Sequence, residues 1–258
     1  MNPLLRSVFW GAVKIPAMRK LLSVSAMKIN DAMQALSDQE ITAIYERYKE
    51  FTRIPAQGYA INLSVLGNIP VVNGCVVECG TWRGGMSAGM ADLLGAERTY
   101  YLFDSFEGLP DAKGIDGESA ISWQSDNNVD NCRTEEQYAH DVMELSSAVR
   151  VHIMKGWFNS TLSGFEPDAP IAVLRLDADW YSSTAECLNY LYPFVPKGGL
   201  ILIDDYFAWD GCSRAVHDYL SANSLADRIR TVGSSLAYIV KSDMRAVQSI
   251  STEKELVS

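Results

Sequence analysis

The feature that most constrains the fold is an alternation, from residue 75 onward, of short apolar runs with helical segments. The predicted strands are Cys75–Cys79, Thr99–Asp104, Val149–Lys155, Ile171–Asp177, Gly199–Asp204, Ile229–Val232 and Leu236–Lys241. The predicted helices between them are Gly84–Leu94, Ser182–Leu191 and Cys212–Ser221. Strands that alternate with helices favour a mostly parallel sheet with helices on both faces. The link between the last two strands is too short for a helical crossover, so we predict an antiparallel hairpin there.

The parts of the chain outside this alternation predict its domain organisation. Residues 1–70 have a helical pattern, clearest in Asp38–Phe51, where apolar residues recur at helical spacing with acids early and a base late. We therefore expect a helical extension over residues 1–70, an α/β domain over 71–245 and a polar tail over 246–258. Within the domain, residues 108–134 are polar and rich in Gly and Asp. A segment of that length is typical of a lid or binding loop, or of disorder, and we predict a lid loop.

Composition and charge exclude several classes of protein. A chain of 258 residues with 48% apolar content can bury one sizeable core. Its net charge of −10 argues against nucleic-acid binding, which needs a basic face. No stretch approaches the ~20 apolar residues of a membrane span. Five cysteines without a CxxC pair argue against a disulfide framework or a zinc site. These features predict a cytoplasmic enzyme with reduced cysteines.

The charge is unevenly distributed along the chain. Residues 1–30 contain five bases and no acid, which leaves a charge of −15 on the remainder. These bases are Arg6, Lys14, Arg19, Lys20 and Lys28. One interpretation is a basic amphipathic arm that lies on an anionic membrane surface or on a partner subunit. The alternative is a leader helix whose apolar face packs on the domain.

A glycine-rich turn after the first predicted strand is a candidate cofactor site. In VVECGTWRGGMSAGM, Gly80, Gly84 and Gly85 let the backbone turn sharply and approach a ligand at a helix N-terminus. The GxGxxG spacing of a dinucleotide site is missing, and Glu78 at the strand end suits the ammonium of a methionine moiety. Asp104 ends the next strand, 24 residues beyond Gly80, where a carboxylate can bind the two ribose hydroxyls of a nucleoside. The alternative is a simple glycine turn whose acids cap helices.

Four acids follow two neighbouring strands. Asp177 and Asp179 are two residues apart at one strand end, and Asp204 and Asp205 end the following strand. In a doubly wound sheet these positions meet in the crevice where ligands bind. The nearest bases in the sequence are too few to neutralise the four acids: Arg175, Lys197 and Arg214. Because clustered carboxylates repel one another, we expect a hard divalent cation, and an all-oxygen site suits Mg²⁺.

Such a cation suggests a mechanism. It would bind a substrate hydroxyl and lower its pKa, and a carboxylate outside the metal's ligands would remove the proton. The oxygen would then attack a sulfonium methyl group in line. The alternative is that these strand-end aspartates cap the helices that follow them.

Five motifs together resemble the macrocin O-methyltransferase family. They are ECGTWRGG, FDSFEGLP, MKGWFNSTL, LRLDADWYSST and GGLILIDDYFAWDGC, and the resemblance runs from about Tyr59 to Tyr238. It implies a Rossmann-like class I methyltransferase with a seven-stranded, mostly parallel sheet, an antiparallel last strand and an N-terminal helical extension. It also implies S-adenosylmethionine and Mg²⁺ as cofactors, and a homo-oligomer. Members methylate sugar hydroxyls on macrolide and other antibiotics, and one relative methylates a phenolic coumarin precursor.

The resemblance also implies roles for individual residues. Asp177, Asp204 and Asp205 resemble the metal ligands, and Asp179 resembles the general base. Lys155–Phe158 is expected beside the adenine. The predicted cofactor-binding residues are Glu78, Gly80, Thr81, Gly84, Ser87, Asp104, Ser105, Gly156, Trp157 and Asp177.

We therefore expect Mg²⁺-dependent methyl transfer from S-adenosylmethionine to a hydroxyl, with a sugar as the favoured small-molecule acceptor. A catechol-like phenol is the alternative acceptor, and an aromatic slot in the lid would favour it. Candidate walls for such an acceptor are Trp123, Trp180, Tyr181 and Tyr206. A nicotinamide oxidoreductase is disfavoured by the missing GxGxxG, and a non-catalytic nucleoside-binding protein by the intact DAD and DD elements. The sequence does not name the acceptor or its hydroxyl position.

Overall fold

The computed structural model describes residues 39–127 and 130–242. The chain divides after Ala43 into two compact units. Of the first unit, only residues 39–43 are described, and they are helical. The second unit begins at Ile44 and contains all the strands and helices named below. The predicted basic arm over residues 1–30 and the polar tail over 246–258 lie outside the described residues.

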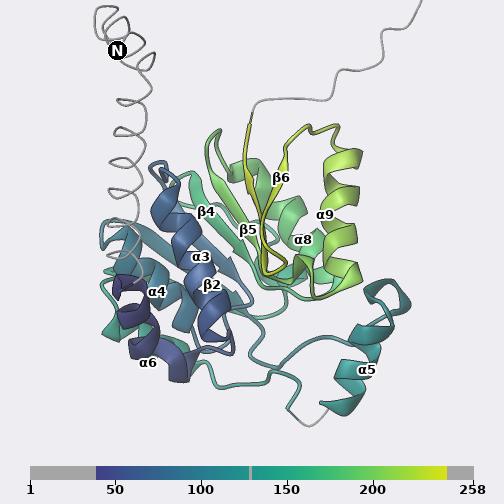
Figure 1. The fold of residues 1–258 in the computed structure, drawn as a ribbon, viewed down its shortest axis with the longest axis horizontal. Helices are drawn as coiled ribbons and strands as arrows, with labels where there is room; N and C mark the ends of the chain where they lie inside the picture. Colours follow the sequence, from purple (N-terminus) through teal and green to yellow (C-terminus); the bar gives the residue numbers. More distant parts are fainter. Residues whose placement is uncertain (1–38, 128–129, 243–258) are drawn as a thin grey trace, which may run out of the picture. The chain divides into compact units, whose positions relative to one another are not determined.

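A seven-stranded sheet forms the centre of the second unit (Figure 1). Its strands are β1 (Cys75–Cys79), β2 (Thr99–Asp104), β3 (Arg150–Lys155), β4 (Ile171–Leu176), β5 (Leu200–Ile203), β6 (Ile229–Val232) and β7 (Leu236–Val240). They lie in the order β3-β2-β1-β4-β5-β7-β6. The first five strands are parallel, while β7 is antiparallel to both β5 and β6. The predicted sheet class and the terminal hairpin are therefore confirmed, and each predicted strand ends within one residue of the observed one.

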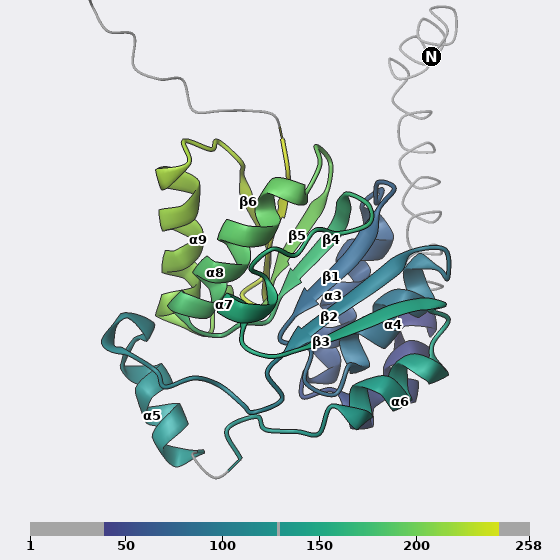
Figure 2. The same cartoon turned by 180° about the vertical axis from the view of Figure 1, so that it is seen from behind.

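Helices cover both faces of this sheet. Helices α3 (Ala56–Asn68), α4 (Gly85–Leu94) and α6 (Gln137–Leu145) lie on one face (Figure 1). Helices α7 (Phe158–Thr161), α8 (Tyr181–Leu191) and α9 (Asp210–Ala222) lie on the other (Figure 2). Strands β1, β4 and β5 are buried along their whole length, which explains their nearly continuous apolar sequences. A core cluster of apolar residues lies between the sheet and helices α8 and α9.

The segment predicted as a lid loop, residues 108–134, contains regular structure. A 3-10 turn, η2 (Gly114–Asp116), leads into helix α5 (Glu118–Asp126). The expectation that this segment acts as a lid stays a prediction. Helix α5 buries only Ala120 completely, so its sequence carries little helical periodicity. The segment is tied to α8 because the Asp116 carboxylate accepts a hydrogen bond from the Tyr181 backbone N–H at 2.7 Å.

Helix α3 belongs to the second unit and packs against α4. It follows a short 3-10 turn, η1 (Lys49–Phe51). The Tyr59 hydroxyl is buried and donates a hydrogen bond to the Gly85 carbonyl at 2.9 Å. A Cβ at Gly89 would lie only 1.9 Å from that hydroxyl oxygen, so the glycine permits the close approach of the two helices. Among the described residues, no helix is long and apolar enough to cross a membrane.

Candidate active site

The carboxyl ends of β1, β2, β4 and β5 meet at a cavity of about 250 Å³. The strand order reverses between β1 and β4, which is where open α/β sheets bind ligands. The predicted site residues that line the cavity are Glu78, Gly80, Thr81, Asp104, Asp177, Asp179 and Asp204. The structure therefore brings together residues from four separate sequence motifs.

The turn after β1 depends on Gly80. This residue has φ +83°, and a Cβ there would lie 1.7 Å from the Asp177 carbonyl oxygen. Only glycine allows the ends of β1 and β4 to lie this close. Gly84 also has a left-handed backbone, but its Cβ position faces Val142 of α6 at 2.9 Å. Gly84 does not line this cavity, so its contact with a cofactor stays a prediction.

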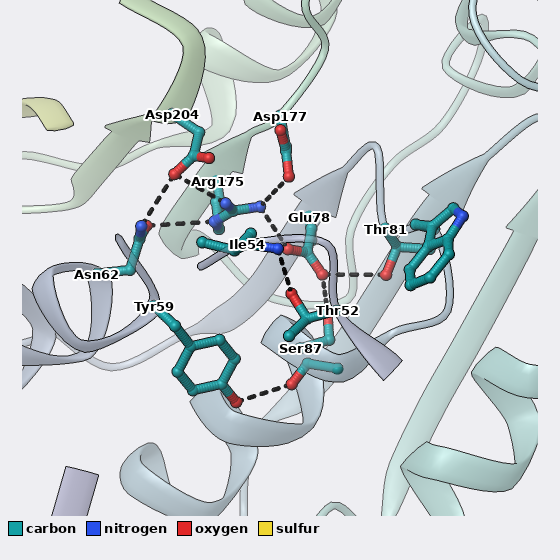
Figure 3. Close-up of polar contacts among 12 residues, drawn as sticks. Thr52, Ile54, Tyr59, Asn62, Glu78, Thr81, Ser87, Arg175, Asp177 and Asp204 are labelled. Carbon is teal, nitrogen blue, oxygen red and sulfur yellow. Dashed lines mark hydrogen bonds and ion pairs between the residues drawn. The ribbon is translucent and has the colours of Figure 1, made fainter. Parts of the chain in front are cut away.

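Glu78 is completely buried and is one of the residues that line the cavity. Its polar contacts are drawn in Figure 3. One carboxylate oxygen accepts hydrogen bonds from the Thr81 hydroxyl at 3.0 Å and from the Ser87 hydroxyl. The other oxygen is 2.8 Å from Nη1 of Arg175. Ser87 does not line the cavity, and its hydroxyl donates a hydrogen bond that helps to orient Glu78. Both oxygens of Glu78 therefore already have protein partners. The predicted contact with a cofactor ammonium would be an additional interaction of the same carboxylate.

Asp104 ends β2 and is held by backbone N–H groups. Its two oxygens accept hydrogen bonds from Trp82 and from Phe106, each at 2.7 Å. Trp82 and Phe106 both have a positive φ, of 49° and 57°, so each turn is bent tightly toward the carboxylate. Burial raises the pKa of Asp104 despite these bonds. A buried, oriented carboxylate at this strand end is suited to accept hydrogen bonds from a pair of ligand hydroxyls.

A second hollow, of about 50 Å³, adjoins the first and shares Gly80, Asp104 and Asp177 with it. Six predicted cofactor residues line it: Gly80, Asp104, Ser105, Gly156, Trp157 and Asp177. Phe158 lies beside them, so the region expected near an adenine does border a cavity. The contacts with a cofactor themselves stay predictions.

Three aspartates converge at the acidic side of the first cavity. Asp177, Asp179 and Asp205 each offer a carboxylate oxygen, and these three atoms lie within 4.8 Å of one another. Burial raises the pKa of Asp177 to about 7 although Arg175 opposes the change. Burial and the charge of Asp177 raise the pKa of Asp179 to about 8, and that of Asp205 also rises well above its usual range. Oxygen donors that repel each other so strongly fit a hard divalent cation.

Asp204 is placed differently from the set that we predicted as metal ligands. Its Oδ1 atom accepts a hydrogen bond from the Asn62 side chain at 2.9 Å and lies 2.9 Å from Nη2 of Arg175. The tight group of three contains Asp179, the predicted base, in place of Asp204.

Arg175 lies at the centre of these acids and is fully buried on β4 (Figure 3). Its guanidinium is 2.8 Å from Glu78, 2.9 Å from Asp177 and 2.9 Å from Asp204. Burial lowers the pKa of Arg175, but these carboxylates outweigh that effect and raise it well above its usual value. This one cation therefore orients more of the acids than the sequence suggested.

The backbone and a neighbouring indole orient Asp179. It has a left-handed φ of 53°, which is uncommon for a residue other than glycine. Its backbone N–H donates to Asp205 at 3.0 Å, and its Oδ1 accepts a hydrogen bond from the Trp209 indole at 3.0 Å. Among the described residues, its Oδ2 atom has no hydrogen-bond partner. The carboxylate is therefore fixed by one oxygen, and the other can take part in chemistry.

Several lining residues were not predicted as site residues. They are Thr52, Arg53, Ile54, Pro55, Trp82, Met86, Gly108, Leu109 and Cys132. Residues 52–55 and Cys132 come from segments without a recognisable motif, whereas the others lie within motifs that were singled out for different residues. Arg53 links two of these segments, since its guanidinium lies 2.8 Å from Asp130 and 5.5 Å from the Trp82 ring. None of the four aromatic residues predicted as acceptor walls lines this cavity. Trp180 is completely buried and packs edge-on against Trp123.

The raised pKa values predict a pH dependence of stability in the metal-free protein. An unfolded Asp has a pKa of about 3.9, so folded Asp177 and Asp179 keep protons that the unfolded chain has released. Their contribution to stability is present below the unfolded pKa and is lost as pH rises through about 7 to 8. We expect the metal-free Tm to fall by several degrees between about pH 6 and pH 9, and saturating Mg²⁺ to restore it most at high pH. Thermal unfolding across this range tests the expectation, and a Tm that rises with pH would contradict it.

Comparison with known protein families gives one model match. The family described as macrocin O-methyltransferase (TylF) matches residues 65–241. Demethyldecarbamoylnovobiocin O-methyltransferase of Streptomyces niveus is 36% identical over 181 residues, which are 65% of each chain. The 8-demethyl-8-(2,3-dimethoxy-alpha-L-rhamnosyl)-tetracenomycin-C 4'-O-methyltransferase of Streptomyces olivaceus is 35% identical over 67% of each chain. The matches thus span about two thirds of the length of these relatives.

Two solved structures resemble this fold. The O-methyltransferase NovP aligns with a TM-score of 0.61 and 28% identity, covering 74% of this chain and 82% of NovP. The calicheamicin methyltransferase CalS11 aligns with a TM-score of 0.58 and 19% identity, covering 78% of this chain and 93% of CalS11. The second likeness concerns the fold alone. Both place the observed sheet among known methyltransferase folds.

Proposed function

Since the chain belongs to the macrocin O-methyltransferase family, we propose that it transfers a methyl group from S-adenosylmethionine to a sugar hydroxyl with the help of Mg²⁺. The observation that carries this proposal is the group formed by Asp177, Asp179 and Asp205. It lies beside a cavity lined by residues of the glycine turn after β1. A ligand held over that turn would therefore meet the carboxylates that a hydroxyl acceptor needs.

The cofactor's place in this proposal follows from the two adjoining cavities. Glu78, Gly80 and Thr81 line the first. Gly156 and Trp157 line the second, and Asp104 lines both. S-adenosylmethionine, when bound, supplies an electrophilic methyl group on a sulfonium. We assign its methionine moiety to the cavity at Glu78, its ribose to Asp104, and its adenine to the hollow beside Trp157.

The metal's place rests on the donor set. Asp177 and Asp205 belong to the converging group, and Asp204 lies beside Asp177 on the shared guanidinium of Arg175. A divalent cation, when bound, would draw electron density from the acceptor hydroxyl and so lower its pKa. We retain Asp177, Asp204 and Asp205 as the proposed ligands. The dependence on Mg²⁺ is part of the proposal.

Asp179 is the proposed general base. Its raised pKa makes its carboxylate a stronger proton acceptor than an ordinary Asp, and its Oδ2 faces no competing donor among the described residues. As the acceptor oxygen forms its bond to the methyl carbon, the carbon–sulfur bond breaks and its electron pair passes to sulfur. Asp179 takes the hydroxyl proton. The Trp209 indole keeps the carboxylate in place during this transfer.

We favour a sugar over a catechol as the acceptor. Residues 52–55 add the polar side chains of Thr52 and Arg53 to the wall, and none of the four aromatic residues predicted as acceptor walls is among the lining residues, although Trp82 is. The relative from Streptomyces olivaceus is named for methylation of a rhamnosyl group. We therefore propose a glycoside of a natural product or surface polysaccharide as the acceptor. Assembly as a homo-oligomer stays a prediction.

A methyl-transfer assay tests the proposed reaction. The purified full chain is incubated with S-adenosylmethionine, Mg²⁺ and separate panels of glycosides and catechols, and products are detected by mass spectrometry. We expect a methylated glycoside that disappears when EDTA replaces Mg²⁺. Products only from catechols would contradict the acceptor class. Undiminished turnover in EDTA would contradict the role of the metal.

A further inference from the structure

We propose that Asn62 is a positioning residue that orients the carboxylate group from helix α3. This inference rests on the proposed function, because it concerns the same metal-binding carboxylates. Asn62 lies before the residues matched by the family model, which begin at residue 65. It also lies outside every motif that predicts the site.

Asn62 is a buried amide whose groups are all engaged (Figure 3). Its side chain is 1% exposed. Its Oδ1 atom accepts a hydrogen bond from Nε of Arg175 at 3.2 Å, and its Nδ2 donates to Oδ1 of Asp204 at 2.9 Å. The same Nδ2 also donates to the Gly58 carbonyl one helical turn earlier, at 3.0 Å. The amide is therefore fixed to the helix backbone while it bridges the buried guanidinium of Arg175 and the partly buried carboxylate of Asp204.

The bridge determines which oxygen of Asp204 faces away from the protein's own donors. Its Oδ1 is held by Asn62 and Arg175, and no described residue donates a hydrogen bond to its Oδ2. Asp177 shows the same division, with its Oδ2 held by Arg175 at 2.9 Å. Asp205 shows it too, with its Oδ2 held by the Asp179 backbone at 3.0 Å. Each proposed metal ligand thus has one oxygen anchored by the protein and one available.

A neutral amide is the residue type that this position requires. It must accept from Arg175 and donate to Asp204 at once, which an Asp, a Lys or an apolar side chain cannot do. Groups that hold a metal ligand from outside the coordination sphere change metal affinity by about 10- to 100-fold when they are removed. Helix α3 is therefore part of the metal site, acting through Asn62.

Binding of Mn²⁺ tests this role without an assay of turnover. Free Mn²⁺ is measured by electron paramagnetic resonance during titration of the full chain at saturating S-adenosylhomocysteine. We expect Asn62→Leu to bind Mn²⁺ about 10- to 100-fold more weakly than the wild type, with S-adenosylhomocysteine affinity unchanged by calorimetry. Asn62→Ala leaves room for water to reach Arg175 and Asp204, so it should fold even if the Leu variant does not, and should show the same loss.

Tyr59→Phe is the matched control, because it removes one buried hydrogen bond of the same helix whose acceptor is the Gly85 carbonyl and not an aspartate. We expect it to keep the wild-type affinity for Mn²⁺. The inference is overturned if the folded Asn62 variants bind Mn²⁺ as the wild type does, or if Tyr59→Phe weakens binding equally. A wild-type protein that binds S-adenosylhomocysteine but no Mn²⁺ would instead overturn the proposed metal dependence, and the role of Asn62 with it.

Discussion

Replacing Asp179 with Asn is expected to lower kcat by about 10²- to 10⁴-fold, the usual contribution of a general base. The amide keeps the size of the carboxylate and an oxygen for the Trp209 indole, but it cannot take the hydroxyl proton. Because we propose that Asp179 is a base and not a ligand, divalent-cation affinity should change little. Steady-state kinetics and Mn²⁺ titration on the same preparation measure both quantities.

Asp204→Asn is the variant with which Asp179→Asn is compared. The variant removes one proposed ligand charge while Asn62 and Arg175 remain in place. We expect it to lose both cation affinity and turnover. Equal cation affinity in the two variants would contradict the division of roles. Loss of the cation only in Asp179→Asn would show instead that Asp177, Asp179 and Asp205 are the ligands, as their mutual distances allow.

Replacing Arg175 with Gln is expected to destabilise the protein by about 3–5 kcal/mol, because it leaves one buried and two partly buried carboxylates without their cation. In a domain of this size that corresponds to a fall in Tm of roughly 10 °C. Arg175 lowers the pKa of Asp177 against burial, so its removal should raise that pKa further. The loss of stability should therefore be larger at pH 8 than at about pH 5.5, where Asp177 is already protonated. Thermal unfolding at the two pH values measures it.

Arg98→Gln is the control for this prediction. Arg98 is partly buried and donates to the carbonyls of Val72 and Gly74, each at 2.9 Å, but it has no carboxylate partner in the structure described. We expect a cost of about 1 kcal/mol or less, similar at both pH values. If Arg175→Gln behaved like Arg98→Gln, the buried ion pairs would not hold the site together.

The sheet could be predicted from the sequence because its strands are buried on both faces. That burial makes runs such as Ile171–Leu176 almost wholly apolar, and turns or acids mark their ends. The proximity of Asp177 and Asp205 could also be predicted from the sequence, since the carboxyl ends of neighbouring parallel strands meet at one edge of the sheet. Helix α5 could not be predicted from the sequence, because it buries only one residue completely and its sequence resembles a polar loop.

The interactions that orient the site could not be predicted, because they join distant parts of the chain. Asn62 and Asp204 are 142 positions apart, and no local pattern links an amide on a helix to an acid beyond a strand. The left-handed backbone of Asp179 is likewise imposed by its surroundings. One signal was available for Arg175. A base within a strand predicted to be buried on both faces requires buried acids as partners.

Calorimetric titration of the full chain, first with S-adenosylhomocysteine and then with Mg²⁺, tests the central claim most directly. The account predicts saturable binding of the nucleoside at micromolar concentration, followed by binding of Mg²⁺. Release of protons at pH 7 should accompany the metal, because two of the proposed ligands, Asp177 and Asp205, have raised pKa values. Nucleoside binding without any binding of Mg²⁺ would contradict the proposed mechanism, and failure of both to bind would contradict the assignment of this cavity as a methyl-transfer site.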